Sequence, residues 1–212
     1  MSPADEAAAR CLLLDFSGVL FADPMGAVQT AIAEAAGMDR EAIRRFYAES
    51  LRDALWRGTS GEPQFWDRLL AHAGLPRDAR PWRELMIGGT VPLPACASLA
   101  RWSERATLFL VSNQRSEWID AALSRHGVPP RVFARRFVSD QTGLLKPEPE
   151  IYEAVIAAWG GSVERMLYVD DDERYLEAAA RFGIATVSGD ADGAWRRAVE
   201  AWLDRGPDAP RP

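Results

Sequence analysis

The chain has 212 residues, of which 48% are hydrophobic and 26% are charged, and its formal net charge is −6. This length predicts one domain, or one domain with a sizeable insertion, and this composition excludes a disordered chain. No apolar run approaches the ~20 residues needed to cross a bilayer, and the acidic balance argues against a nucleic-acid-binding protein.

The first predicted strand is the apolar run CLLLDF at residues 11–16, which is too short and too continuous for a helix. After it, the sequence carries helical patterns only, separated by glycines and prolines. We expect these helices at residues 26–36, 39–56, 61–73 and 78–87. About seventy helical residues are far more than one strand connection needs, so we predict an inserted α-helical cap.

Strands and helices alternate along the rest of the chain. Four apolar runs predict strands at residues 106–112, 135–139, 165–170 and 183–188. Helical patterns that end at glycines cover residues 116–126, 148–159 and 173–182. The alternation predicts an α/β fold with a Rossmann-like parallel sheet of about five strands and helices on both faces. We therefore divide the chain into an α/β core (8–23 and 93–205), a helical cap (24–92) and a flexible tail (206–212).

Polar side chains follow four predicted strands at their carboxyl ends. They are Asp15, Ser112 with Asn113, Lys146, and the acidic run Asp170–Asp172. Ligands of an open parallel sheet bind at this edge. A nucleophilic carboxylate, a hydroxyl donor, a cation and a cluster of acids at one edge suit phosphoryl transfer.

Each of these groups also has an ordinary structural explanation. A carboxylate such as Asp15 can close a turn, a serine such as Ser112 can cap a helix, and Lys146 can be a solvated loop residue. Acids are favourable at the start of a helix, which accounts well for Asp172. Asp171 fits a metal ligand better.

The predicted cap is rich in aromatic and basic residues. Tyr47, Trp56 and neighbouring aromatic residues could line a substrate pocket or pack the interior of the cap. Four arginines could contact a substrate anion, although we expect a solvated helix face for them: Arg44, Arg45, Arg52 and Arg57.

At the polar residues that follow the predicted strands, the chain resembles the haloacid dehalogenase-like (HAD) hydrolase superfamily. LLLDFSGVL is similar to the first motif of that superfamily, LFLVSN to the second, GLLKPEPEIY to the third and MLYVDDDERYLEAA to the fourth. The order and spacing match over residues 11–190. The cap resembles the C1 type, which is inserted after the first motif, and RGTSGEPQFWDRLL is similar to a phrase common in such caps.

The resemblance implies a role for each matching residue. Asp15 would be the nucleophile that forms an aspartyl-phosphate. Ser112 would hydrogen-bond the transferring phosphoryl group, and Asn113 would help to shape the loop. Lys146 would pair with both the nucleophile and the phosphate.

The resemblance also implies a Mg²⁺ ion. Asp15, Asp171 and the backbone carbonyl of Ser17 would bind it, and Asp170 would orient the site or share the ion through water. A hard cation with oxygen ligands suits this acid cluster.

The chain departs from the family pattern at two positions. Most family phosphatases have an aspartate as general acid and base where this chain has Ser17, and serine cannot donate a proton near neutral pH. The first motif of this chain is similar to that of a phosphatase-like subgroup with the pattern D-x-[GS]-G-V, which has small residues in this turn. Asp23, Asp172 and Glu173 are candidates for a substitute acid. The second departure is Tyr175, where the family often has Asp or Asn.

We therefore expect a Mg²⁺-dependent phosphatase of a small phosphorylated metabolite. One alternative, favoured by Ser17 and Tyr175, is a catalytically weak relative that binds a phosphorylated ligand or a partner. A less favoured alternative is a metal-independent 2-haloacid dehalogenase, which would have little use for the acid cluster. Two cysteines and no signal-peptide pattern indicate a cytoplasmic protein. We expect no membrane or nucleic-acid partner, and either a monomer or a homodimer.

Overall fold

The structure is a computed structural model that describes residues 10–205. Five parallel strands form one sheet in the order β3-β2-β1-β4-β5. Their bounds are β1 (Cys11–Leu14), β2 (Thr107–Ser112), β3 (Arg135–Val138), β4 (Met166–Asp170) and β5 (Ala185–Ser188). Each predicted strand corresponds to one of these, so the predicted α/β class and the parallel sheet are confirmed. The predicted tail, residues 206–212, lies outside the described residues.

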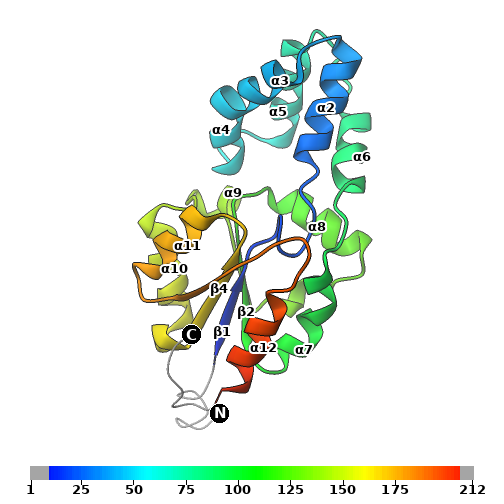
Figure 1. The fold of residues 1–212 in the computed structure, drawn as a ribbon. Coiled ribbons are helices and arrows are strands. Elements are labelled where there is room, and N and C mark those ends of the chain that lie inside the picture. The colour runs from blue at the N-terminus through cyan, green and yellow to red at the C-terminus, as the bar shows by residue number, and fades with distance from the viewer. Residues whose placement is uncertain (1–9, 206–212) are drawn as a thin grey trace.

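Helices cover both faces of the sheet (Figure 1). Leu12 and Leu14 of β1 pack with α7 (Leu99–Ser103), α8 (Ser116–Arg125) and α12 (Arg196–Asp204). Cys11 and Leu13 face the other way, towards α10 (Pro149–Trp159) and α11 (Glu173–Ala180). Successive residues of a strand point to opposite faces, so a strand that is covered on both sides is apolar throughout. Burial on both faces thus explains the continuous apolar runs in the sequence.

Several short elements complete this part of the chain. The predicted ranges did not include α7, α12 or the four-residue α9 (Ser139–Thr142). Single turns of 3₁₀-helix lie at Pro94–Ser98, Pro130–Val132 and Val163–Arg165. No helix within residues 10–205 is both long and apolar enough to span a membrane.

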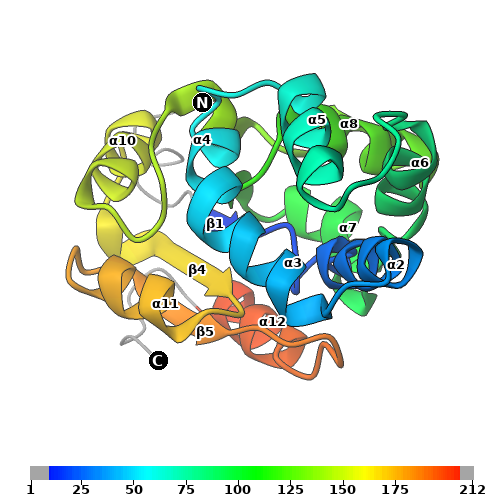
Figure 2. The ribbon, with the colours of Figure 1, turned by 90° about the horizontal axis from the view of Figure 1, so that it is seen from above.

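Residues 25–88 form an all-helical insertion between β1 and β2, and we call them the helical insertion. It contains α2 (Met25–Ala36), α3 (Arg40–Phe46), a π-helix (Tyr47–Leu51), α4 (Arg52–Trp56), α5 (Glu62–His72) and α6 (Arg80–Gly88). Its helices surround an apolar cluster of their own, which includes Val28, Ile32, Leu55 and Phe65. The insertion stands over the carboxyl ends of the strands, and from above α3 and α4 cross over the end of β1 (Figures 1 and 2).

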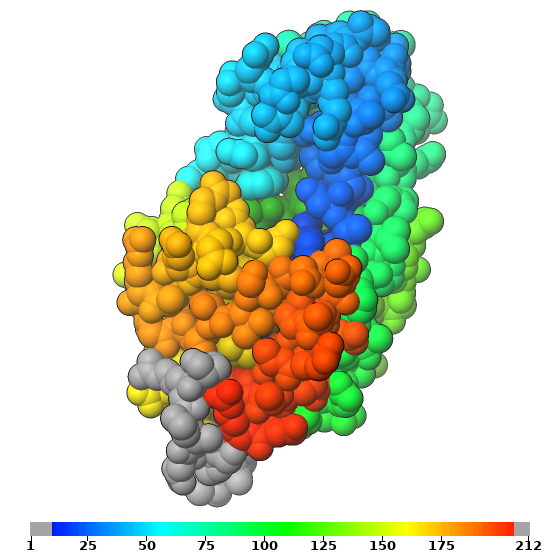
Figure 3. Space-filling model, viewed as in Figure 1, coloured from blue at the N-terminus to red at the C-terminus, as the bar shows by residue number. Residues whose placement is uncertain are grey.

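The loop between α4 and α5 joins the insertion to the sheet side of the molecule. Arg57 forms an ion pair with Glu148 at the start of α10 and donates to the Gly143 carbonyl. A Cβ on Gly58 would lie 2.2 Å from the Asp140 carbonyl oxygen, so the two backbones touch there. The chain enters the insertion near residue 22 and leaves it near residue 92. Between these two segments and the Gly58–Asp140 contact, the surface is hollowed (Figure 3). A cavity of about 590 Å³ opens there onto the strand ends.

Candidate active site

Asp15 lies at the floor of this cavity, one residue after β1. Its backbone N–H donates to the Val169 carbonyl at 3.0 Å, which holds it level with the end of β4. Its side chain is 8% exposed. β1 is the central strand, so the sheet order itself brings Asp15 between the ends of β2 and β4.

Lys146 faces Asp15 from the loop before α10. Its Nζ lies 2.9 Å from Asp15 Oδ1 and 2.6 Å from Asp170 Oδ2, and the side chain is buried. Asn113 holds this loop through two hydrogen bonds: its amide donates to the Lys146 carbonyl at 2.9 Å, and the Lys146 N–H donates to its Oδ1 at 2.8 Å. Asn113 therefore fixes the position of the only lysine in the chain.

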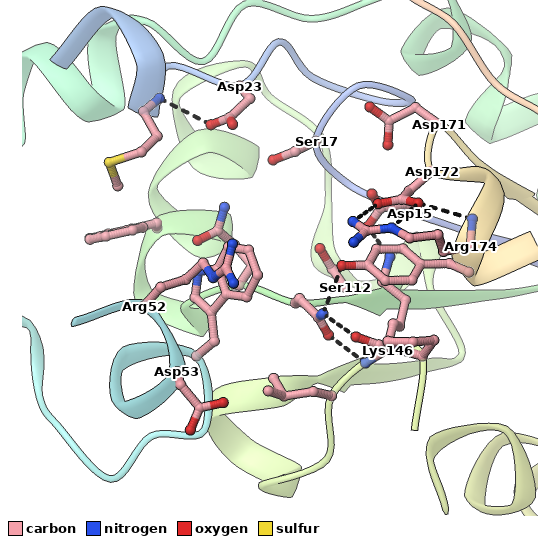
Figure 4. A pocket seen from close by; sticks show the side chains of 18 of the residues that line it. Asp15, Ser17, Asp23, Arg52, Asp53, Ser112, Lys146, Asp171, Asp172 and Arg174 are labelled. Carbon is pink, nitrogen blue, oxygen red and sulfur yellow. Dashed lines mark hydrogen bonds and ion pairs between the residues drawn. The ribbon is translucent and has the colours of Figure 1, made fainter. Parts of the chain in front are cut away.

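The three consecutive aspartates have three different environments. Asp170 is fully buried and accepts from Lys146 Nζ, the Tyr168 hydroxyl and the Asp172 N–H. Asp172 caps α11 by accepting from the Arg174 N–H and forms an ion pair with the Arg174 side chain. Asp171 instead points into the cavity beside Asp15 (Figure 4).

A glycine in the turn after β1 makes room for Asp171. Gly18 has φ +82°, and a Cβ at this position would lie 2.1 Å from Asp171 Oδ2. Any side chain at residue 18 would thus displace the Asp171 carboxylate, besides being strained at this φ. The turn after β1 and the acidic run after β4 are therefore fitted to each other.

The electrostatics of this cluster are unbalanced. Burial raises the pKa of Asp15 to about 7; the charges of Asp170 and Asp171 also raise it, whereas Lys146 lowers it. Burial and the charge of Asp170 raise the pKa of Asp171 in the same way. Burial alone would lower the pKa of Lys146, but the charges of Asp15 and Asp170 raise it by more. The pKa of Lys146 therefore lies above its usual value. Three carboxylates thus share one buried cation.

The donor set fits a hard divalent cation. One oxygen from each of Asp15, Asp170 and Asp171 lies within 4.8 Å of the others. Lys146 Nζ lies 2.9 Å from the buried Asp15 Oδ1, but within residues 10–205 no donor is aligned for a hydrogen bond to this oxygen. Carboxylate oxygens are the ligands that Mg²⁺ takes in proteins, and a cation here would offset the excess negative charge. Asp170 already accepts three hydrogen bonds, so Asp15 and Asp171 have the freer oxygens.

The other predicted site residues line the same cavity. Ser112, buried at the end of β2, and Ser17, in the turn after β1, are both on its wall. Tyr175 lies against the Lys146 loop: its hydroxyl is 3.5 Å from Asn113 Nδ2, and Lys146 Nζ is 4.8 Å from its ring centre. The tyrosine, one of the two departures from the expected motif pattern, therefore packs against the lysine and the asparagine that holds its loop.

All three candidate acids also line the cavity. Asp172 is held by Arg174, which lowers its pKa. Burial raises the pKa of Asp23, while the hydrogen bond from the Met25 N–H lowers it. Its carboxylate still faces the cavity near Ser17 and can be reached by solvent (Figure 4).

The helical insertion supplies the upper wall. Tyr47, Arg52 and Trp56 line the cavity, whereas Arg44 and Arg45 lie on an exposed face. Sequence patterns did not indicate several further wall residues, because loop geometry and packing bring them there: Met25, Met86, Gln114, Trp118 and Arg174.

Solved structures share this fold at low sequence identity. A predicted HAD-like family hydrolase from Porphyromonas gingivalis is 21% identical with a TM-score of 0.77, over 94% of this chain and 100% of that chain. A HAD family enzyme from Bacteroides thetaiotaomicron, solved with magnesium and inorganic phosphate, is 20% identical with a TM-score of 0.76, over 90% and 98%. The L-2-haloacid dehalogenase from Xanthobacter autotrophicus, with chloropropionic acid covalently bound, is 20% identical with a TM-score of 0.60, over 85% and 77%.

The sequence itself carries the family signal. None of the curated proteins compared matches the chain. The profile of the family described as haloacid dehalogenase-like hydrolase does match, over residues 9–183. This range contains strands β1 to β4, the acid cluster and the helical insertion. The chain therefore belongs to the haloacid dehalogenase-like hydrolase family.

Proposed function

We propose that this hydrolase is a Mg²⁺-dependent phosphatase that acts on a small phosphorylated molecule through an aspartyl-phosphate on Asp15. The observation that carries the proposal is the buried Asp15–Lys146 pair beside Asp171, at the floor of a cavity large enough for a small molecule. The Bacteroides thetaiotaomicron neighbour bound magnesium and inorganic phosphate in the same fold, which supports this choice.

In the first step, an Asp15 carboxylate oxygen attacks phosphorus, and the bond from phosphorus to the leaving oxygen breaks. Lys146 Nζ and the Ser112 hydroxyl hold the phosphoryl oxygens in place. In the second step, water attacks the aspartyl-phosphate, which releases inorganic phosphate and restores the Asp15 carboxylate. Mg²⁺, bound by Asp15, Asp171 and the Ser17 carbonyl, would supply a positive charge for the phosphoryl oxygens. Asp170 orients Lys146 from its buried position.

The alcohol that leaves in the first step needs a proton, and we assign its donation to Asp23. Asp172 is unsuited, because its ion pair with Arg174 stabilises the ionised form. Glu173, the first residue of α11, is exposed to solvent. Asp23 lines the cavity on the side of Ser17, and burial raises its pKa, which favours the protonated form that an acid requires.

The helical insertion would act as a C1-type cap (residues 24–92) over a core formed by residues 8–23 and 93–205. A cap over a strand-end site excludes water and sets specificity. We further propose a cytoplasmic enzyme, either a monomer or a homodimer, that acts on small molecules and not on nucleic acid.

The direct test is phosphate release from a panel of sugar phosphates, nucleotides and acyl phosphates, with Mg²⁺ and with EDTA. We expect release that requires Mg²⁺ and is lost in Asp15→Asn, which keeps the shape of the side chain. Release that persists in EDTA or in Asp15→Asn would overturn the proposal.

A dehalogenase is the second candidate, because Ser17 replaces the acid that a phosphatase uses and a haloacid dehalogenase shares the fold. A metal-free reaction at carbon gives no purpose to Asp171 beside Asp15, so we rank it lower. Halide release from 2-chloropropionate in EDTA would favour it. Tight binding of a phosphorylated ligand with no turnover across the panel would favour a catalytically weak relative.

A further inference from the structure

Arg52 stands out among the cations that line the cavity. Lys146 pairs with Asp15 and Asp170, and Arg174 pairs with Asp172. Arg52 has no carboxylate partner among residues 10–205; its guanidinium lies over the ring of Trp56, 5.4 Å from the ring centre. The N–H donors of a guanidinium lie in its own plane, so a contact with a ring face leaves them free for a planar or tetrahedral anion.

The backbone brings Arg52 to this wall by an unusual route. Tyr47–Leu51 form a π-helix, in which the Arg52 N–H donates to the Tyr47 carbonyl five residues earlier. In a regular α-helix, five residues turn through about 500°, so Tyr47 and Arg52 would point about 140° apart. The wider turn of the π-helix brings the two residues closer to one side of the helix, and both line the cavity together with Trp56. Single π-turns inside helices occur frequently at functional sites.

Apolar side chains line the same cavity as the exposed Arg52. Met25, Met86 and Trp118 contribute apolar surface to its wall, and such a wall strengthens the attraction between opposite charges inside the cavity. Asp53 is the acid next to Arg52 in the sequence and also lines the cavity, but it pairs with Arg57 (Figure 4). The positive charge of Arg52 is therefore not neutralised by its neighbour.

We propose that Arg52 binds a second anionic group of the substrate, at the opposite end from the phosphoryl group that Asp15 attacks. The inference rests on the proposed phosphatase function and names its substrate class: phosphate monoesters that also carry a carboxylate or a second phosphate. Trp56 holds the guanidinium in place, and the Asp15 side of the cavity performs the reaction.

The test uses matched compounds that differ only in the second group. These are ω-carboxyalkyl phosphates with two to five methylene groups, the corresponding primary amides, and the corresponding alkanediol bisphosphates. For the wild type we expect a higher kcat/KM for one of the two anionic series than for the amides at a favoured chain length. Preference for the carboxylates or for the bisphosphates identifies the second group.

Arg52→Gln should lower kcat/KM for the favoured anionic series by about 10- to 100-fold, mainly through KM, and should leave the amides unchanged. Arg52→Lys, which keeps the charge without the planar fork, should fall in between. Arg45→Gln is the control, because it removes the same charge from an exposed position of the insertion that does not line the cavity. An anion-to-amide ratio that Arg52→Gln leaves unchanged at every chain length would overturn the inference.

A binding measurement separates this inference from the phosphatase proposal. The non-hydrolysable phosphonate analogues of the same compounds are titrated calorimetrically into wild type and Arg52→Gln with Mg²⁺ present. Tighter binding of an anionic analogue than of its amide, lost in Arg52→Gln, supports the Arg52 site even if no compound is hydrolysed. Equal binding of all analogues by both proteins contradicts it.

Discussion

At the scale of single residues, the site brings three carboxylates together, and the repulsion between them opposes folding. Asp15, Asp170 and Asp171 share only Lys146, and the pKa of Asp15 rises to about 7. A carboxylate whose pKa is raised in the folded state binds more protons than in the unfolded state between about pH 4 and pH 7. Without metal, its contribution to the free energy of unfolding therefore falls as the pH rises through this window.

Asp15→Asn should consequently be inactive but more stable. We expect the free energy of unfolding in EDTA at pH 7.5 to increase by about 2 kcal/mol, because the variant removes one negative charge from the cluster. Denaturant unfolding with and without Mg²⁺ measures this. Mg²⁺ should stabilise the wild type more than the variant; equal stabilisation of both proteins would contradict the assigned metal site.

Gly18→Ala should weaken Mg²⁺ activation, because its Cβ would displace the Asp171 carboxylate. We expect the Mg²⁺ concentration for half-maximal activity to rise at least about 10-fold. Gly37→Ala is the matched control: Gly37 also has positive φ, at +62°, but a Cβ there meets nothing within 4 Å. If both variants lose stability alike and neither changes the Mg²⁺ requirement, Gly18 serves only the backbone turn.

Asp23→Asn tests the assigned proton donor through the leaving group. The amide keeps an acceptor for the Met25 N–H, so the start of α2 is preserved. We expect kcat/KM for an alkyl phosphate to fall by about 10²–10⁴-fold, whereas 4-nitrophenyl phosphate, whose leaving group needs no proton, should change far less. Asp39→Asn, at an exposed helix cap, is the control. An equal loss for both substrates would exclude Asp23 as the acid.

At the scale of elements, the α4–α5 loop connects the helical insertion to the loop that carries Lys146. Arg57 pairs with Glu148, and Glu148 in turn accepts from the Leu145 N–H at 3.0 Å. Nearby, the Arg115 guanidinium donates to the Ser60 carbonyl. The insertion is therefore held against the residues that position the lysine.

Arg57→Gln should loosen this connection. We expect KM to rise about 3- to 10-fold with little change in kcat, since a partly exposed ion pair contributes about 1 kcal/mol. We also expect faster hydrogen exchange in the α4–α5 loop. Arg44→Gln breaks an exposed pair with Glu41 inside the insertion and should change neither quantity. Unchanged exchange in Arg57→Gln would show that the pair does not hold the insertion.

At the scale of the whole molecule, the sheet order explains how much the sequence could predict. The inner strands β1, β2 and β4 appear as apolar runs because both of their faces are buried, and parallel strands bring residues such as Asp15 and Lys146 to one edge. The π-helix was not predictable, because its residues continue an ordinary helical pattern. The environments of Asp170 and Arg52 were not predictable either, because they depend on side chains from distant elements.

The proposed mechanism requires that Asp15 becomes phosphorylated during turnover. The enzyme is allowed to reach the steady state with Mg²⁺ and substrate, then quenched and reduced with borohydride, and its peptides are mapped by mass spectrometry. We expect homoserine at residue 15, formed by reduction of the aspartyl-phosphate, and none without substrate. Sustained phosphate release with an unmodified Asp15 peptide, or with modification at another carboxylate, would contradict it.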